Sequence, residues 1–143
     1  MQLDNDLWVP RPLDHVFAFF SDAANLEALT PPWLHFRILT PKPIAMHQGT
    51  LIDYSIRLHG IPISWQSEIS VWDPPHRFVD IQRRGPYRRW EHTHGFAAVN
   101  GGTRVTDQVE FDVPFAFLAG RLVQRNVEKI FAFRREALSK RFG

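Results

Sequence analysis

Between residues 33 and 113, apolar side chains recur at nearly every second position, which is the period of a strand whose alternate side chains face opposite sides of a sheet. Glycine, proline and asparagine residues interrupt this pattern at short intervals, and closely spaced strands of this kind form an antiparallel meander. Asn100-Gly101-Gly102 predicts a tight hairpin, because these residues adopt positive φ at low cost. The expected strands are residues 3–9, 33–39, 50–59, 61–72, 77–83, 88–99 and 103–113.

Helical spacing replaces the strand pattern at both ends of the chain. Pro12 opens a short helix that runs to Phe20, and Ser21-Asp22 caps a second short helix that continues through Leu29. The last segment, residues 115–141, carries a broad apolar stripe, which is typical of a helix that covers the apolar face of a sheet. The stripe consists of Leu118, Leu122, Val123, Val127, Ile130, Phe131, Ala137 and Leu138. The order of elements therefore predicts an α+β fold.

Length and composition are those of one globular domain covering residues 1–143, with 44% hydrophobic residues. The chain has no cysteine, which excludes disulfides, a thiolate nucleophile and cysteine metal ligands. A net charge of +2 does not by itself indicate nucleic-acid binding, and we expect no nucleic-acid partner. Because the start of the chain lacks a secretory signal and no apolar segment is long enough to cross a bilayer, we expect a cytoplasmic protein.

Three ionisable residues lie on strand faces that are otherwise apolar. His92 and His94 share a face with Trp90, and Asp107 shares its face with Val109 on the neighbouring strand. An ionisable group on an inward face is costly unless it has a partner or faces a wet or ligand-filled cavity. These residues therefore indicate a pocket, in which Asp107 accepts a hydrogen bond from one imidazole and fixes its tautomer.

Taken together, these elements and residues resemble the START-like (SRPBCC, helix-grip) superfamily over essentially the whole chain. The narrower similarity is to a bacterial cyclase/dehydrase-like, ligand-binding subgroup. It rests on Ala24-Asn25-Leu26, Thr30-Pro31-Pro32, Gly85-Pro86-Tyr87, Trp90, His92, His94 and Asp107. The resemblance implies a curved seven-stranded antiparallel sheet wrapped around the C-terminal helix, with two short helices after the first strand and an apolar cavity between sheet and helix. The superfamily includes carriers, sensors and enzymes, so the fold alone does not decide the function.

The inward strand faces and the helix stripe supply the expected wall of such a cavity, suited to a flat or greasy ligand such as a lipid, an isoprenoid or a polyketide-like aromatic. The expected ligand-binding residues are Tyr54, Ile56, Trp65, Asp80, Gln82, Trp90, His92, His94, Phe96, Asp107, Val109, Phe111, Leu122 and Ile130. On the same faces lie Ile52, Leu58, Ile63, Ile69 and Val71. We expect the ligand to be oriented by His92, His94 and Asp107, with Asp80, Gln82 and Tyr54 in a secondary role. We expect ligand access near the short helices and residues 41–49, where proline and glycine favour irregular backbone.

The same polar residues permit other interpretations. In the first, His92, His94 and Asp107 form a buried hydrogen-bond network whose only role is to fix the strand register. A second is a divalent metal site, although no third firm ligand is identifiable, and we expect neither a metal nor another cofactor. A third is a cyclase or dehydratase in which His92, His94 and Asp107 are the catalytic candidates and Arg57 or Tyr54 stabilises an enolate.

The segment from Arg83 to Arg89 is strongly basic, with two arginines on each side of Gly85-Pro86-Tyr87. Such a hairpin is most often a solvated surface feature. It also suits weak contact with an anionic ligand or a membrane surface. A dedicated partner-binding module is a further alternative, and it predicts an interface at this hairpin with no ligand in the cavity.

Overall fold

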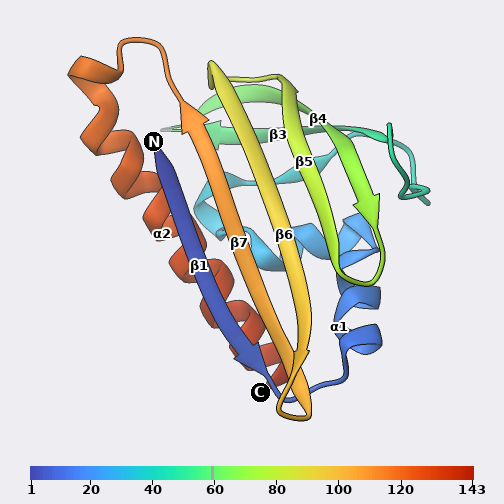
Figure 1. Cartoon of the computed structure of the whole chain (residues 1–143). Helices are drawn as coiled ribbons and strands as arrows, with labels where there is room; N and C mark the ends of the chain where they lie inside the picture. Colours follow the sequence, from blue (N-terminus) through green and yellow to red (C-terminus); the bar gives the residue numbers. More distant parts are fainter. Residues whose placement is uncertain (59) are drawn as a thin grey trace.

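Seven antiparallel strands form one curved sheet against a long helix in the computed structural model of the chain, which describes residues 1–58 and 60–143 (Figure 1). The strands are β1 Gln2–Val9, β2 Arg37–Ile38, β3 Leu51–Leu58, β4 Ile61–Asp73, β5 Arg77–Arg84, β6 Arg89–Val99 and β7 Gly102–Asp112. The helices are α1 Leu13–Phe20, the 3₁₀ helices η1 Ala23–Leu29 and η2 Pro32–Leu34, and α2 Ala116–Phe142.

The strand order in the sheet is β1-β7-β6-β5-β4-β3-β2. Strands β2 to β7 therefore follow one another as a meander, and β1 closes the far edge by pairing with β7. The β6–β7 hairpin turns at Asn100 and Gly101, which have φ of 51° and 77° as the sequence predicts. α2 runs beside β1 and contacts η1 (Figure 1). The expected helix-grip α+β fold is confirmed.

The segment expected to be a strand over residues 33–39 folds differently. Pro31 and Pro32 lead into the short helix η2, and His35 follows with a positive φ of 48°, so only Arg37 and Ile38 pair with β3. Proline lacks a backbone N–H and has a fixed φ, which favours a helical turn here over a ladder of hydrogen bonds. The expected strand over residues 50–59 ends at Leu58 in the structure, and its last predicted residue, His59, lies outside the described residues.

A change of register in β4 corrects the inward face predicted for its second half. Between Ile69 and Val71 the pairing with β5 shifts, and the residue that packs against the buried cluster beyond this point is Trp72. A bulge reverses which alternate side chains face inward. Val71, which the simple alternation places on the cavity face, is therefore out of phase with Trp65 and Ile69.

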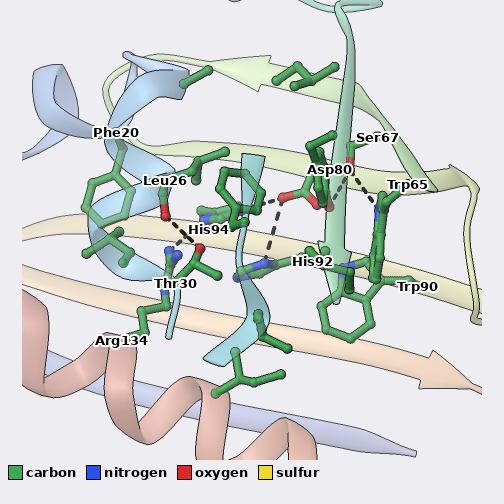
Figure 2. Close-up of a pocket in the computed structure, with 18 of the residues that line it drawn as sticks. Phe20, Leu26, Thr30, Trp65, Ser67, Asp80, Trp90, His92, His94 and Arg134 are labelled. Atoms are coloured by element: carbon green, nitrogen blue, oxygen red, sulfur yellow. Dashed lines mark hydrogen bonds and ion pairs between the residues drawn. The ribbon is translucent and has the colours of Figure 1, made fainter. Parts of the chain in front are cut away.

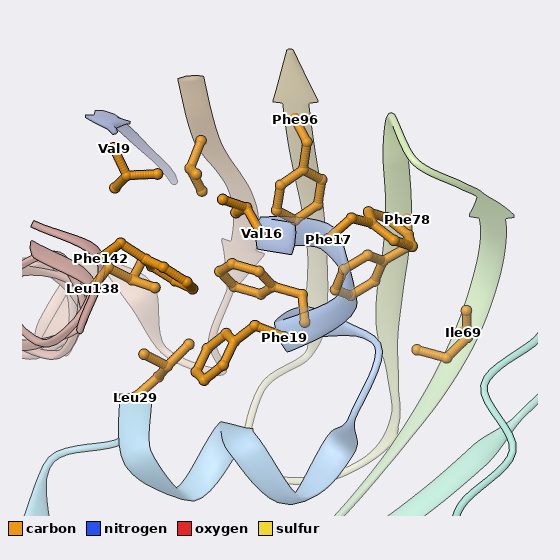
Figure 3. Packing of buried hydrophobic residues seen from close by; sticks show 12 residues of the cluster. Val9, Val16, Phe17, Phe19, Leu29, Ile69, Phe78, Phe96, Leu138 and Phe142 are labelled. Carbon is orange, nitrogen blue, oxygen red and sulfur yellow. The ribbon is translucent and has the colours of Figure 1, made fainter. Parts of the chain in front are cut away.

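One end of the space between sheet and helix is filled by aromatic side chains (Figure 3). Phe17 from α1 packs against Trp72 and Phe96 with ring centroids 5.3 Å apart in each case. Leu138 and Phe142 from the end of α2 complete this cluster. Since α1 follows β1 after a short turn, it closes this end of the sheet.

α2 is buried along its second half and exposed at its start. Val127, Phe131 and Leu138 are buried, whereas Leu118 and Leu122 are exposed. The predicted apolar stripe is thus correct for the later turns only. Among the described residues, no helix is long and apolar enough to cross a membrane.

Candidate functional site

A cavity of about 170 Å³ lies between the sheet, the short helices and α2. Strands β3 and β4 contribute Tyr54, Ile56 and Trp65 to its wall, and Ile130 comes from α2. The wall also includes Leu34 of η2, Phe36 just after it, Leu26 and Leu29 of η1, and Met46. Most of the wall is therefore apolar, and the region where the sequence predicts ligand access forms one side of it.

The polar side of the cavity is formed by adjacent strands. Asp80 in β5 pairs in register with His92 in β6, and His94 lies two residues further along β6 on the same face. These three residues line the cavity together with Trp90 (Figure 2). The predicted residues Tyr54, Ile56, Trp65, Asp80, Trp90, His92, His94 and Ile130 are all brought to this one cavity.

Four of the predicted apolar residues do not line the cavity. Phe96 packs with Phe17 in the aromatic cluster, because it lies one step further along β6, where α1 closes the sheet. Val109 and Phe111 pack against α2 in a separate buried cluster. Leu122 is exposed, because the start of α2 extends past the sheet.

Gln82 and Arg57 also differ from expectation. The Gln82 side-chain amide donates to the Tyr87 backbone oxygen at 2.7 Å and accepts from the Tyr87 backbone nitrogen at 3.0 Å. Gln82 thus fixes the β5–β6 turn and does not reach the cavity. Arg57 is exposed on β3 between the inward residues Ile56 and Leu58, and strand alternation places it on the opposite face from an enolate bound in the cavity.

Two short hydrogen bonds connect the histidines to carboxylates. Nε2 of His92 lies 2.7 Å from Oδ1 of Asp107, and Nε2 of His94 lies 2.6 Å from Oδ2 of Asp80. Asp107 is not part of the cavity wall, so it supports His92 from behind. The two imidazole rings stack with centroids 3.6 Å apart, and His94 also stacks on Phe78 at 3.9 Å. Packing and hydrogen bonds together hold both rings in one orientation.

Arg134 of α2 completes this network, and the sequence analysis did not single it out. Its guanidinium lies 3.2 Å from Asp107 Oδ1 and 3.2 Å from His94 Nδ1, and its side chain is almost entirely buried. A signal was present in the sequence, because position 134 falls on the stripe formed by Val127, Phe131 and Leu138. A charged residue on the buried face of a helix indicates a buried partner.

The network holds both carboxyl groups in their ionised form. Burial alone raises the pKa of Asp107, but the Arg134 charge and the hydrogen bond from His92 outweigh it and lower that pKa well below its usual range. Burial likewise opposes ionisation of Asp80, and the hydrogen bond from His94 reverses this and lowers its pKa. Burial, followed by the proximity of His92, lowers the pKa of His94 to about 4.

The hydrogen-bond partners of the two imidazoles determine where their protons lie. A guanidinium can only donate, so His94 Nδ1 accepts from Arg134 and the ring proton is on Nε2, which donates to Asp80. His92 donates from Nε2 to Asp107, while its Nδ1 lies 3.8 Å from Asp80 Oδ2, beyond hydrogen-bond distance. Among the four ring nitrogens, His92 Nδ1 is therefore the one that remains available to a ligand.

Asp80, His92 and His94 have the residue types and the spacing of a metal site, with candidate ligand atoms within 4.8 Å of one another. A histidine that binds a metal through one nitrogen usually donates its other N–H to an acceptor. His94 has no nitrogen free for a metal, because Nδ1 accepts from the guanidinium of Arg134 and Nε2 carries the proton that it donates to Asp80. The proton arrangement of His94 therefore does not suit a metal ion.

A second polar group lies on β3 and β4, beside Asp80 of the neighbouring strand β5. Trp65 Nε1 donates to Ser67 Oγ at 3.1 Å, and the hydroxyl of Tyr54 lies 3.3 Å from the same oxygen. Burial raises the pKa of Tyr54 well above its usual value, so its hydroxyl is protonated. Ser67 was not predicted because a serine in an alternating strand carries little signal of its own.

The chain was compared with known families, curated proteins and solved structures. The family model described as polyketide cyclase / dehydrase and lipid transport matches residues 9–136. That description covers activities on hydrophobic molecules, and it agrees with hydrophobic ligand binding in general terms. No curated protein shows significant similarity to the chain.

Several solved structures share the fold. TTHA0849 from Thermus thermophilus is 23% identical with a TM-score of 0.68, and the match covers 96% of each chain. CV1439 from Chromobacterium violaceum is 14% identical with a TM-score of 0.77, covering 99% of this chain and 96% of that one. Ara h 8.0201 is 17% identical with a TM-score of 0.65, covering 97% of this chain and 98% of that one.

At these identities the neighbours establish the helix-grip fold alone, and the family assignment rests on the sequence match over residues 9–136. The expected membership of the START-like superfamily is thereby confirmed. The chain belongs to the polyketide cyclase / dehydrase and lipid transport family.

Proposed function

We propose that this protein binds a small hydrophobic molecule, with an aromatic ring as the best-fitting body, in the cavity between sheet and α2. The observation that supports this most strongly is the composition of the cavity wall. Aromatic and aliphatic side chains surround the space, and polar atoms that can orient a ligand converge on one side at Asp80, His92 and His94. Few, well-placed polar groups in an apolar pocket are typical of ligand sites.

The volume of the cavity favours a compact ligand over a long one. At about 170 Å³ it is close to the engineered cavity of about 150 Å³ that accommodates benzene. A single-ring aromatic therefore fits the cavity as it stands, whereas a lipid or isoprenoid requires η1 and η2 to move away from the sheet. Burial of about 300 Å² of ligand surface contributes about 7 kcal/mol before ordering costs, which is consistent with micromolar binding at best.

The ligand's polar group is proposed to lie against His92 Nδ1 and the Asp80 carboxylate. Asp80 accepts hydrogen bonds because it is ionised, and Nδ1 accepts in the neutral form of His92, whose Nε2 donates to Asp107. A hydroxyl or phenol donor satisfies them, while a ligand carboxylate adds negative charge beside Asp80. We expect phenols to bind better than the corresponding benzoates.

The test is isothermal titration calorimetry with the single-ring apolar probe p-cresol, with phenol and benzoate titrated for comparison. The variant Ile130→Trp places a large ring in the cavity and should abolish probe binding. Leu122→Trp, an exposed position on the same helix, is the matched control and should bind like the wild type. Equal binding by wild type and Ile130→Trp contradicts a ligand in this cavity.

A second candidate function, acid–base catalysis of a cyclisation or dehydration, is supported by the free Nδ1 of His92. A base oriented through its other nitrogen by a buried carboxylate is arranged for proton transfer. An enzyme predicts that Asp107→Asn lowers turnover of a short β-polyketide thioester at least tenfold while probe affinity is retained. A binding protein predicts no turnover above background with either form.

A further inference from the structure

The start of α2 exposes a group of large apolar side chains that the cavity does not use. Phe115 is 67% exposed, Phe117 85%, Leu118 77% and Leu122 59%. Single exposed apolar residues are ordinary, but a contiguous group on one helix end marks an interaction surface. We call these four residues the α2 apolar tip.

The backbone at the beginning of this tip is also unusual. Phe115 precedes α2 with φ of 59° and ψ of 39°, a left-handed conformation that bulky side chains rarely adopt. Glycine or asparagine makes such a helix entrance at lower cost. With this strained backbone, the Phe115 ring is exposed to solvent. Packing of the core therefore does not explain the strain.

Exposed arginines lie at the same end of the molecule as the apolar tip. The Arg88 backbone nitrogen donates to the Asp112 oxygen, three residues before Phe115, so the β5–β6 turn lies beside the connection from β7 to α2 (Figure 1). Arg121 is exposed on α2 next to Leu122 and lines a surface hollow together with Phe117 and Leu118.

Two exposed arginines at this end are not neutralised by an ion pair. The acidic residues Glu110 and Asp112 each have an arginine within 4 Å, namely Arg89 and Arg88. In the part of the chain that the structure describes, Arg84 and Arg121 have no acidic partner within that distance. Exposed aromatic and aliphatic groups next to unneutralised arginines form a surface complementary to the headgroup region of an anionic bilayer.

We propose that the α2 apolar tip and the neighbouring arginines dock this protein on the surface of membranes that contain anionic phospholipids. Phe117 and Leu118 enter the boundary between headgroups and acyl chains, and Arg84 and Arg121 contact phosphate and carboxylate groups. A second copy of the chain is a poorer occupant, because a two-fold contact brings the same arginines of both copies together. This inference goes beyond the proposed function and does not depend on what the cavity holds.

The docking surface adjoins the aromatic part of the cavity. Tyr87 belongs to the β5–β6 turn, and its ring packs against Trp65 and Trp90 in the cavity wall.

The experiment is cosedimentation of the full chain with large vesicles of pure phosphatidylcholine, or of phosphatidylcholine and phosphatidylserine at a ratio of about seven to three. Binding should be strong on the mixed vesicles, weak on the neutral ones, and reduced by raising the salt concentration to about 0.5 M. The double variant Phe117→Ser/Leu118→Ser should lower the partition coefficient at least tenfold, and Arg84→Glu/Arg121→Glu should abolish the preference for phosphatidylserine.

Two matched controls distinguish binding through this surface from non-specific adsorption to vesicles. Leu39→Ser removes a comparably exposed apolar side chain elsewhere, and Lys140→Glu reverses an exposed charge at the opposite end of α2. Both should bind vesicles like the wild type. Equal binding to both kinds of vesicle, absence of binding, or a concentration-dependent dimer that Phe117→Ser/Leu118→Ser dissociates would overturn the proposal. Because all substituted side chains are exposed, circular dichroism should show an unchanged fold.

Discussion

At the residue scale, five ionisable side chains are buried or nearly buried at one place: Asp80, His92, His94, Asp107 and Arg134. Both carboxyl groups are ionised, and His94 is neutral at pH 7 because burial lowers its pKa to about 4. Each imidazole donates to a carboxylate, so the buried charge is distributed over hydrogen bonds. This arrangement leaves acceptors on the cavity side, with the donor Arg134 beside them.

The first prediction concerns the pH dependence of stability. The pKa of His94 is about 4 in the folded protein, lowered chiefly by burial, against 6.5 as the ordinary value. Between these pH values the unfolded chain binds a proton that the folded chain does not, so the free energy of unfolding falls as the pH falls. The expected loss is about 1.4 kcal/mol per pH unit, or about 3 kcal/mol in total, and the contribution is constant above pH 6.5.

Urea denaturation at several pH values between about 7 and about 4.5 measures this loss. His94→Asn keeps a donor near Asp80 but removes the titrating ring, and it should flatten the dependence in this window. His76→Asn, at an exposed turn, should leave the dependence unchanged. A wild-type slope that persists in His94→Asn would show that another group titrates.

The residue scale is also where sequence reasoning reached its limit. That His92 and His94 face inward follows from strand alternation, which needs only the local sequence, whereas their meeting with Asp80 depends on the pairing of β5 with β6. Arg134 and Ser67 were missed because their roles depend on which helix face meets which strand. Gln82 and Phe96 were assigned to the cavity by alternation alone, which gives the face of a strand but not the position along it where the cavity ends.

At the element scale, α2 has three parts with different surroundings. Its first turns are exposed, its middle supplies Ile130 to the cavity wall, and Arg134 and Leu138 anchor its later turns against the sheet. The sequence predicts the helix and its bounds closely, because the apolar stripe is long. It predicts the short strand β2 poorly, because the alternating pattern indicates a strand over residues 33–39 whereas Pro31 and Pro32 favour a helical turn there.

The second prediction tests how α2 is anchored. Arg134→Met removes the cation beside Asp107 and leaves a buried carboxylate without compensation, so it should lower the free energy of unfolding by about 3 to 5 kcal/mol. Arg125→Met, at an exposed position of the same helix, should change it by less than about 0.5 kcal/mol. Combining Arg134→Met with Asp107→Asn should restore part of the loss. Wild-type stability of Arg134→Met would show that the ion pair does not anchor the helix.

At the scale of the whole molecule, the antiparallel meander and its covering helix are predictable because each element carries its own periodic signal. The sequence also indicates that a pocket exists, from ionisable residues on inward faces. Its size is not predictable in the same way. It depends on where α1 and η1 close the sheet, on the bulge in β4 and on the aromatic cluster around Phe17. These are long-range packing outcomes that no local pattern encodes.

The central claim is that the cavity holds a small hydrophobic ligand. Native mass spectrometry of the protein purified without detergent tests it most directly, followed by denaturation and identification of any released compound. We expect a one-to-one complex with a compact aromatic molecule that carries a hydroxyl group. The variant Ile130→Trp should lack this complex, and Leu122→Trp should retain it. An empty protein that no hydrophobic probe stabilises against thermal unfolding would contradict the claim and leave the buried network with a structural role only.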